Sequence, residues 1–245
     1  MMRHLSSATP TPRARGGHGA EAVPDWLGVT ALQVRLRRLR GRAWHAAIAT
    51  RHRLHRRILL ARLPKQGEGA EIGVWRGDFS ARLLRHAKPS RLHLIDPWQH
   101  PSEQGYEHAR FARRDDSQME LIYRGVRERF GREIACGQVV IHRQPSAVAV
   151  AALPPLDWVY IDGDHTFEGV AADLRSCWAR LTPNGRVAGD DYGVRGWWED
   201  GVTKAVDEFA RSEDCKKTII GTQFLLRKVS PRDEAGRRRK PRGRA

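Results

Sequence analysis

Residues 156–192 read LDWVYIDGDHTFEGVAADLRSCWARLTPNGRVAGDDY and decide the fold. Two short apolar runs, 158–161 and 186–189, predict strands. Over residues 170–181 the apolar side chains recur at three- and four-residue steps, which predicts a helix that stops at the turn of residues 183–185. A strand, a helix and another strand make a parallel crossover unit. The stretch therefore predicts an α/β protein.

Paired acids follow both strands of this unit. Asp162 and Asp164 come after the first strand, and Asp190 and Asp191 follow the second. Parallel strands end at the same edge of a sheet, which is the edge where open α/β sheets bind ligands. Carboxylates crowded in this way need a cation or a proton to tolerate one another. The sequence therefore predicts a functional site at this edge.

The rest of the chain supplies the other strands. Strands are expected at 69–75, 91–95 and 138–142, ahead of the crossover unit. Two final runs, 217–220 and 223–226, are separated by only two residues, which predicts a β-hairpin. We therefore expect a Rossmann-like, doubly wound fold, with a mostly parallel seven-stranded sheet and a C-terminal antiparallel hairpin.

A turn with two glycines, Gly73 and Gly77, joins the first strand to a helix. Glycine at such a turn lets a ligand approach the backbone closely, although the spacing matches neither a dinucleotide fingerprint nor a phosphate loop. Asp96 ends the next strand, where an acid can accept hydrogen bonds from ribose hydroxyls. The alternative is that Asp96 only starts the turn before Pro97. Trp98 could offer a flat wall to a nucleobase or pack in the core.

The net charge of +16 is unevenly distributed along the chain. Residues 1–64 contain 13 Arg and two acids, and residues 230–245 contain seven Lys or Arg and two acids, whereas residues 65–229 contain 24 bases and 24 acids. We expect a disordered basic tail over 1–25, a basic amphipathic helical extension over 26–64, a main domain over 65–229, and a second disordered basic tail over 230–245. The neutral main domain argues against a large nucleic-acid footprint.

The helical extension has an apolar stripe and an Arg- and His-rich opposite face. The stripe consists of Leu32, Leu36, Leu39, Ala43, Ala47, Leu54, Ile58 and Leu59. Such a helix can lie on a membrane or on RNA. The interpretation that we favour is a helix that packs its apolar stripe on the main domain and solvates its arginines.

The composition is that of a soluble globular protein, and we expect it to be cytoplasmic. The sequence has no apolar run near the roughly 20 residues that span a bilayer, so we expect no transmembrane segment. No apolar segment follows the N-terminal charges, so we expect no secretory signal. Three widely spaced cysteines without a metal-binding pattern are expected to be reduced thiols.

Several motifs together resemble a known family. They are Glu71-x-Gly73-x-x-x-Gly77, Asp96, Asp162-Gly163-Asp164-His165 and Asp190-Asp191-Tyr192. The set resembles the class I S-adenosylmethionine-dependent methyltransferases, and is most similar to a bacterial branch that includes sugar and natural-product O-methyltransferases. The resemblance covers about residues 67–228 and implies that residues 65–229 are a methyltransferase domain.

The resemblance also implies a cofactor, S-adenosyl-L-methionine, and a divalent metal, usually Mg²⁺. The implied cofactor-binding residues are Glu71, Gly73, Gly77, Asp96, Trp98, Ser146 and Asp162. The implied metal ligands are Asp164, Asp190 and Asp191, and the implied catalytic residues are Asp164 and His165. The register within residues 162–164 stays open, since Asp162 could take the metal-binding role of Asp164. The alternatives are a turn or helix-capping role for the later acid pair and a surface position for His165.

Metal-assisted O-methylation of a small hydroxylated molecule is therefore the leading hypothesis for function. A methyltransferase that acts on nucleic acid through the basic termini is a second, but the motifs that serve exocyclic amines or pyrimidine carbons are missing from the sequence. A non-catalytic relative that binds the cofactor is a third, because fold does not fix function. The chain is also compatible with a homo-oligomer.

Overall fold

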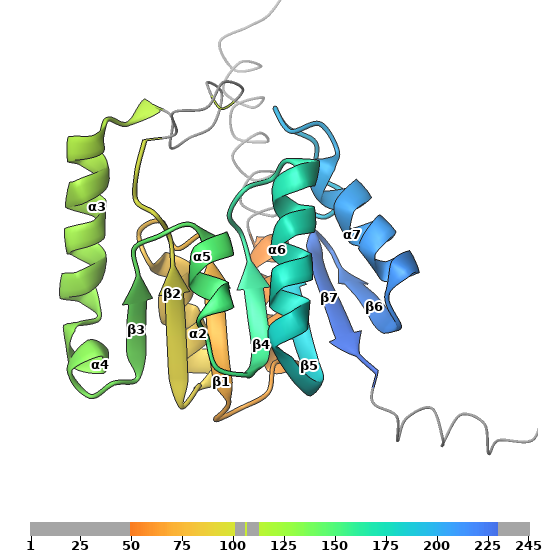
Figure 1. Cartoon of the computed structure of the whole chain (residues 1–245), viewed down its shortest axis with the longest axis horizontal. Coiled ribbons are helices and arrows are strands. Elements are labelled where there is room, and N and C mark those ends of the chain that lie inside the picture. Colours follow the sequence, from red (N-terminus) through yellow and green to blue (C-terminus); the bar gives the residue numbers. More distant parts are fainter. Residues whose placement is uncertain (1–49, 101–105, 107–112, 230–245) are drawn as a thin grey trace, which may run out of the picture. The chain divides into compact units, whose positions relative to one another are not determined.

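A computed structural model describes residues 50–100, 106 and 113–229, and these form one mixed sheet of seven strands flanked by helices (Figure 1). The elements are a helix over residues 50–61, β1 (Glu68–Ile72), α2 (Asp78–Ala87), β2 (Arg91–Ile95), α3 (Asp116–Arg129), α4 (Gly131–Ala135), β3 (Val139–His142), α5 (Ser146–Ala151), β4 (Leu156–Ile161), α6 (Phe167–Arg180), β5 (Leu181–Gly189), α7 (Gly201–Ser212), β6 (Cys215–Ile220) and β7 (Gln223–Lys228). The strand order is β3-β2-β1-β4-β5-β7-β6. This confirms the predicted Rossmann-like fold.

The register of the parallel strands brings the predicted site residues into one row. Ile72 at the end of β1 pairs with Ile95 on one side and with Ile161 on the other, and Ile161 pairs in turn with Gly189. The residues that directly follow these four strands therefore emerge side by side. The hairpin of β6 and β7 is antiparallel, as predicted, and β7 also pairs antiparallel with β5.

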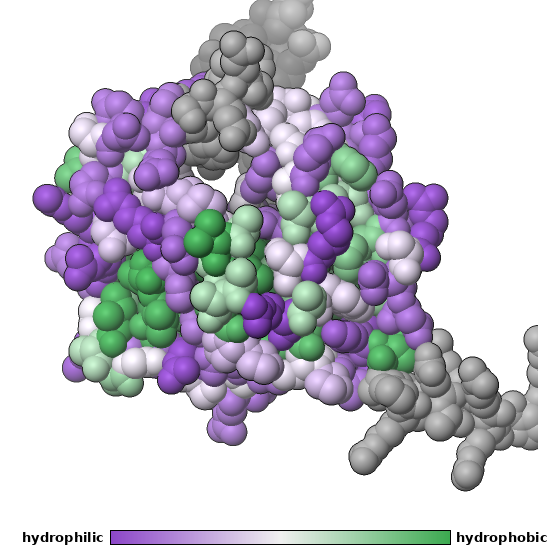
Figure 2. Space-filling view, in the orientation of Figure 1, coloured by the Kyte–Doolittle hydropathy of each residue, from purple (hydrophilic) through white to green (hydrophobic). Residues whose placement is uncertain are grey.

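Both faces of the sheet are covered, so the central strands are apolar on both sides. Alternate residues of β4 illustrate this, because Val159 and Ile161 face the core shared with α5, α6 and α7. Trp158 and Tyr160 face the opposite core, shared with α2, α3 and the helix over residues 50–61. On the face that carries α5 and α6, Figure 2 shows apolar patches beside α5 and β3, separated by hydrophilic residues.

The turn predicted at residues 183–185 lies inside β5, where it forms a bulge. Leu156 pairs with Leu181, and the next pair, Trp158 with Arg186, shows that the extra residues belong to β5 alone. Asn184 takes up the change of direction with a left-handed backbone, at φ 67°. Helix α6 thus ends one residue earlier than predicted, and Leu181 is already extended.

The helix over residues 50–61 buries Leu59 of the predicted stripe but not Leu54 or Ile58. Leu54 and Ile58 are 53% and 39% exposed, whereas Leu59, Leu60 and Leu63 are almost fully buried. The buried positions are spaced by one, three and four residues, so the helix packs on the sheet through a face rotated from the predicted stripe. The described part of this extension therefore packs on the domain, through a face that includes Leu59 but excludes the other predicted positions, Leu54 and Ile58.

The domain division drawn from charge stays a prediction. The tails over 1–25 and 230–245, and the extension up to residue 49, lie outside the described residues, while the compact unit that contains the sheet begins at Ile48. Within the described part, no helix is long and apolar enough to cross a membrane. Cys136, Cys177 and Cys215 are free thiols, as predicted.

Replacing Leu60 by alanine should destabilise the protein, because this 1%-exposed side chain packs the N-terminal helix on the sheet. We expect the free energy of unfolding to fall by about 2–5 kcal/mol, as for other buried leucines. The matched control is Leu54→Ala on the same helix, whose effect should stay within about 0.5 kcal/mol. Urea denaturation measures both, and equal losses would contradict this packing face.

Candidate functional site

Gly73 and Gly77 shape the turn after β1 through contacts within the protein. Both have positive φ, 83° and 74°. A Cβ on Gly73 would lie 2.1 Å from the carbonyl oxygen of Asp162, and one on Gly77 would lie 2.6 Å from the ring of Phe130. The turn therefore needs glycine at both positions for backbone conformation and close packing, whether or not a ligand also approaches it.

Glu71 lies in the interior below this turn. Its side chain is 1% exposed and accepts a short hydrogen bond from the Ser80 hydroxyl. Burial raises the pKa of Glu71 well above its usual range, and this outweighs the bond from Ser80, which lowers it. Burial thus favours the protonated form of Glu71, which supports the turn from beneath.

Asp96 ties together the loops that follow β1 and β2. Its carboxylate accepts backbone N–H bonds from Val74 at 3.0 Å, Trp75 at 2.9 Å and Trp98 at 2.8 Å. Burial raises the pKa of Asp96, although these three bonds oppose the shift. The bond to Trp98 shows that Asp96 starts a turn, and the other two hold it against the glycine turn, while its ribose-binding role stays a prediction.

Two further residues assigned to the cofactor are engaged within the protein. Trp98 is 1% exposed, and its indole N–H donates to the Trp75 carbonyl oxygen at 2.9 Å, so it packs in the core. The Ser146 hydroxyl donates to the Asp173 carboxylate at 2.6 Å, at the start of α5. Trp98 therefore supports the loop from inside.

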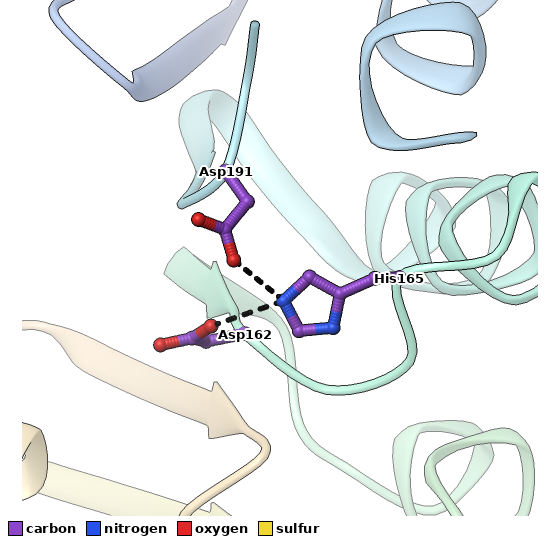
Figure 3. A group of neighbouring side chains, drawn as sticks. All are labelled: Asp162, His165 and Asp191. Atoms are coloured by element: carbon purple, nitrogen blue, oxygen red, sulfur yellow. Dashed lines mark hydrogen bonds and ion pairs between the residues drawn. The ribbon is translucent and has the colours of Figure 1, made fainter. Parts of the chain in front are cut away.

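Three other side chains come together beyond the ends of β4 and β5. Asp162, His165 and Asp191 each offer a ligand atom, and these atoms lie within 4.8 Å of one another (Figure 3). The Nε2 atom of His165 lies 2.8 Å from Asp191 Oδ2 and 3.7 Å from Asp162 Oδ1. All three side chains are partly exposed, so this cluster can reach a substrate.

Burial and charge hold protons on this cluster near neutral pH. Burial, followed by the negative charge of Asp190, raises the pKa of Asp162 to about 7, against the opposing charges of Arg56 and His165. Burial alone would lower the pKa of His165, but the bond to Asp191 and the surrounding carboxylates raise it above its usual value. The cluster can therefore bind or release a proton close to pH 7.

Asp164 points away from this cluster. Its Oδ2 accepts the Tyr106 hydroxyl at 2.7 Å, and its Oδ1 accepts the Thr166 backbone N–H at 2.9 Å. A Cβ on Gly169 would lie 2.2 Å from the same carboxylate, so Asp164 packs against the first turn of α6. Of the two acids between which the sequence left the choice open, Asp162 and not Asp164 lies in the cluster, and the metal-binding role of either stays a prediction.

Asp190 is also separate from the cluster, because other side chains surround it. It is 5% exposed and binds Arg56 through Oδ2 and Gln223 through Oδ1, both closely. Burial would raise the pKa of Asp190, but the charge and the hydrogen bond of Arg56 bring it below the usual value. Of the predicted metal ligands Asp164, Asp190 and Asp191, the structure therefore brings only Asp191 into the cluster.

Aromatic side chains form a rim beside the cluster. The ring centroids of Tyr106 and Trp197 are 5.2 Å apart, those of Trp197 and Trp198 are 5.6 Å apart, and Trp198 packs on His165 at 4.6 Å. Tyr106 and this tryptophan pair lie in the stretches from which the sequence predicts specificity, residues 100–131 and the loop of Trp197 and Trp198, whereas sequence reasoning missed Arg56 and Gln223. The sequence pattern contained no signal for the last two, because their role depends on contacts between distant elements.

Comparison with known proteins assigns the family. The family described as a methyltransferase domain matches residues 70–192, which include every strand end of the site. The chain belongs to this family. No curated protein sequence matches it.

Solved structures resemble this methyltransferase in fold. A candidate rRNA-methylase from Clostridium thermocellum aligns with a TM-score of 0.51 at 12% identity, over 71% of this chain and 94% of that one. A candidate methyltransferase from Streptococcus mutans in complex with SAH aligns with a TM-score of 0.49 at 13% identity, over 71% and 96%. An O-methyltransferase from Bacillus cereus, also in complex with SAH, aligns with a TM-score of 0.48 at 14% identity, over 71% and 78%. At 12% identity, the similarity to the Clostridium thermocellum protein shows the fold alone.

Stability should fall as the pH rises from about 4 to 7. The folded pKa of Asp162 is about 7, above the roughly 3.9 of an unfolded aspartate, so the stability it contributes is largest at low pH and is lost across this window. The raised pKa of His165 acts with the same sign, because its contribution is present below about 6.5 and is lost as the pH rises through the folded pKa.

Melting temperatures of the wild type and Asp162→Asn at about pH 5 and about pH 8 measure this slope. We expect Asp162→Asn to flatten it, whereas Asp214→Asn, on the exposed surface, should keep the wild-type slope. An unchanged slope in Asp162→Asn would contradict the assignment.

Proposed function

We propose that this chain transfers a methyl group from S-adenosyl-L-methionine to a hydroxyl group of a small molecule such as a sugar or natural product. The observation that carries the proposal is the partly exposed cluster of Asp162, His165 and Asp191, beside the glycine turn of a methyltransferase domain. Displacement at a sulfonium methyl group depends mainly on the alignment of two reactants. A site with proton-binding groups next to a cofactor cradle supports this chemistry.

The residues proposed to hold the cofactor are Glu71, Gly73, Gly77, Asp96, Trp98, Ser146 and Asp162. Asp96 fits the ribose-binding role, since a carboxylate has about four lone-pair sites and the described backbone N–H groups use three. Glu71, Trp98 and Ser146 fit supporting roles, because each is bonded within the protein. When bound, the cofactor supplies an electrophilic methyl group on a sulfonium, whose positive charge suits this acidic edge.

A divalent ion fits the cluster of Asp162, His165 and Asp191 better than the predicted set. Two carboxylate oxygens and one imidazole nitrogen already converge there, whereas Asp164 and Asp190 are held elsewhere. Mg²⁺ prefers oxygen ligands, and imidazole suits ions such as Zn²⁺ or Mn²⁺. The donor set therefore favours a transition metal over Mg²⁺. Such an ion lowers the pKa of a bound hydroxyl group.

The alternative is a metal-free reaction in which His165 is the general base. One nitrogen distinguishes the two roles, because Nε2 cannot bind an ion and donate its proton to Asp191 at the same time. In the metal-free case Asp191 would orient the ring, and the other ring nitrogen, which Figure 3 shows turned away from both carboxylates, would accept the substrate proton. Asp164, with Tyr106, would then position the substrate.

Cofactor binding by the full chain tests the methyltransferase proposal directly. Isothermal titration with S-adenosyl-L-methionine should give a one-to-one complex, and Asp96→Asn should weaken it about tenfold or more by removing a charged acceptor. Asp214→Asn should bind as the wild type does. An absence of binding heat and of any thermal shift with the wild-type protein would contradict the proposal.

Chelation separates the two roles of His165. If the cluster holds an ion, EDTA should abolish methylation of a catechol or polyol substrate, and Mn²⁺ or Zn²⁺ should restore it, while Asp191→Asn prevents the restoration. If His165 is a free base, activity survives EDTA, and His165→Gln lowers kcat by about 10²–10⁴. Activity that survives both EDTA and His165→Gln would contradict both roles.

The nucleic-acid hypothesis depends on the basic residues of 1–64 and 230–245, most of which lie outside the described part. The acidic cluster and the neutral main domain give it no support, because binding to phosphates needs positive charge at the site. RNA binding that weakens steeply with salt, together with methyl transfer to RNA, would restore this alternative.

A further inference from the structure

Asp190 is already fully bonded. Its Oδ1 accepts from the Asp191 backbone N–H at 2.9 Å, from the Thr222 hydroxyl at 3.1 Å, and from the Gln223 amide. Its Oδ2 accepts two hydrogen bonds from Arg56, one of them from Nε at 3.1 Å. Five donors therefore share a carboxylate that offers about four lone-pair sites, and the Nε2 atom of His52 also lies 3.4 Å from Oδ1. This leaves no position for a metal ion on Asp190.

Arg56 reaches Asp190 because its helix is fixed on the sheet. The leucines one turn further along, Leu59 and Leu60, are buried, so the face that carries Arg56 must point toward the strand ends. The guanidinium lies 4.9 Å from the centre of the Phe79 ring and 3.7 Å from Asp162 Oδ2. A positive charge thus stands between the acids that follow β4 and β5.

Gln223 extends this arrangement into the core. Its amide oxygen accepts the Tyr160 hydroxyl at 2.8 Å, while its amide nitrogen donates to Asp190. Tyr160 and Gln223 are both fully buried. The orientation of Asp190 is therefore determined from the interior by Gln223 and from the helix by Arg56, which makes it a rigid acceptor for the guanidinium.

We propose that Arg56 is a resident cation of this site, and that it occupies on Asp190 the place a divalent ion takes in a carboxylate cluster. The site then holds at most one exchangeable ion, on Asp162, His165 and Asp191. Arg56 is a positioning residue, since it holds Asp190 and the helix over residues 50–61 against the cluster of Asp162, His165 and Asp191. The part that concerns metal rests on the proposed function, and the ion pair itself does not.

A thermal double-mutant cycle without any ligand tests the pair. Arg56→Met removes the closest positive charge from a buried carboxylate, and Asp190→Asn removes the closest negative charge from a largely buried guanidinium, so each should lower Tm by about 5–15 °C. The double variant should fall no further than the worse single variant. Arg57→Gln, at an exposed arginine of the same helix, is the control and should leave Tm unchanged. Additive losses would overturn the proposal.

A titration with Mn²⁺ tests whether Arg56 takes the place of a metal ion on Asp190. The electron paramagnetic resonance signal measures the free Mn²⁺ at each step. Asp190→Asn should change the Kd less than about threefold, while Asp191→Asn raises it about tenfold or more. Arg56→Met frees a carboxylate and should tighten Mn²⁺ binding or add a second equivalent. Arg56→Lys keeps the positive charge but not both hydrogen bonds, so its Mn²⁺ titration should lie between those of the wild type and Arg56→Met.

The outcomes separate this inference from the proposed function. If Asp190→Asn weakens Mn²⁺ binding as much as Asp191→Asn in folded protein, or if Arg56→Met leaves uptake unchanged, the inference is overturned. If the wild type takes up no Mn²⁺ but Arg56→Met does, the metal-assisted function fails while the resident cation is supported. Cofactor binding by the wild type is unaffected by either result.

Discussion

Crowding of carboxylates at one edge of the sheet is the constraint on which the site depends. Asp162, Asp164, Asp190 and Asp191 all follow β4 and β5, and partial burial makes each bare negative charge costly. The protein satisfies them in different ways. Asp190 pairs with Arg56, Asp191 with His165, and Asp164 with hydrogen-bond donors, whereas Asp162 keeps a proton up to about pH 7.

These different solutions explain why two acid pairs do not make a four-carboxylate metal site. Asp190 already accepts hydrogen bonds from the Arg56 guanidinium and the Gln223 amide. It is therefore held rigidly and its charge is neutralised, so it adds nothing to the affinity for an ion. The acids near His165 are more exposed and have fewer partners, so they remain available to a ligand. Partner residues, more than the number of carboxylates, determine where chemistry can occur on this edge.

The sequence predicts the sheet well because its signals are local. Apolar runs ending in acids or glycine mark β1, β2 and β4, and a two-residue gap marks the hairpin. The partners of the acids could not be predicted in this way. Arg56 depends on the register of a helix whose visible stripe pointed to Leu54, and the choice between Asp162 and Asp164 depends on packing against Gly169. Such contacts join residues far apart in the chain and leave no periodic pattern.

The glycine turn after β1 is in backbone contact with Asp162, and this contact links the turn to the cluster of Asp162, His165 and Asp191. Gly73 lies so close to the Asp162 carbonyl that any side chain would collide with it, and Asp162 in turn donates its backbone N–H to Ile72. A shift of the turn must therefore move Asp162, and with it the contacts to His165 and Arg56. Alignment of a methyl donor and an acceptor tolerates little displacement. Gly73 thus holds the turn against Asp162, the acid that begins the cluster, while Gly77 fits the same turn against the ring of Phe130.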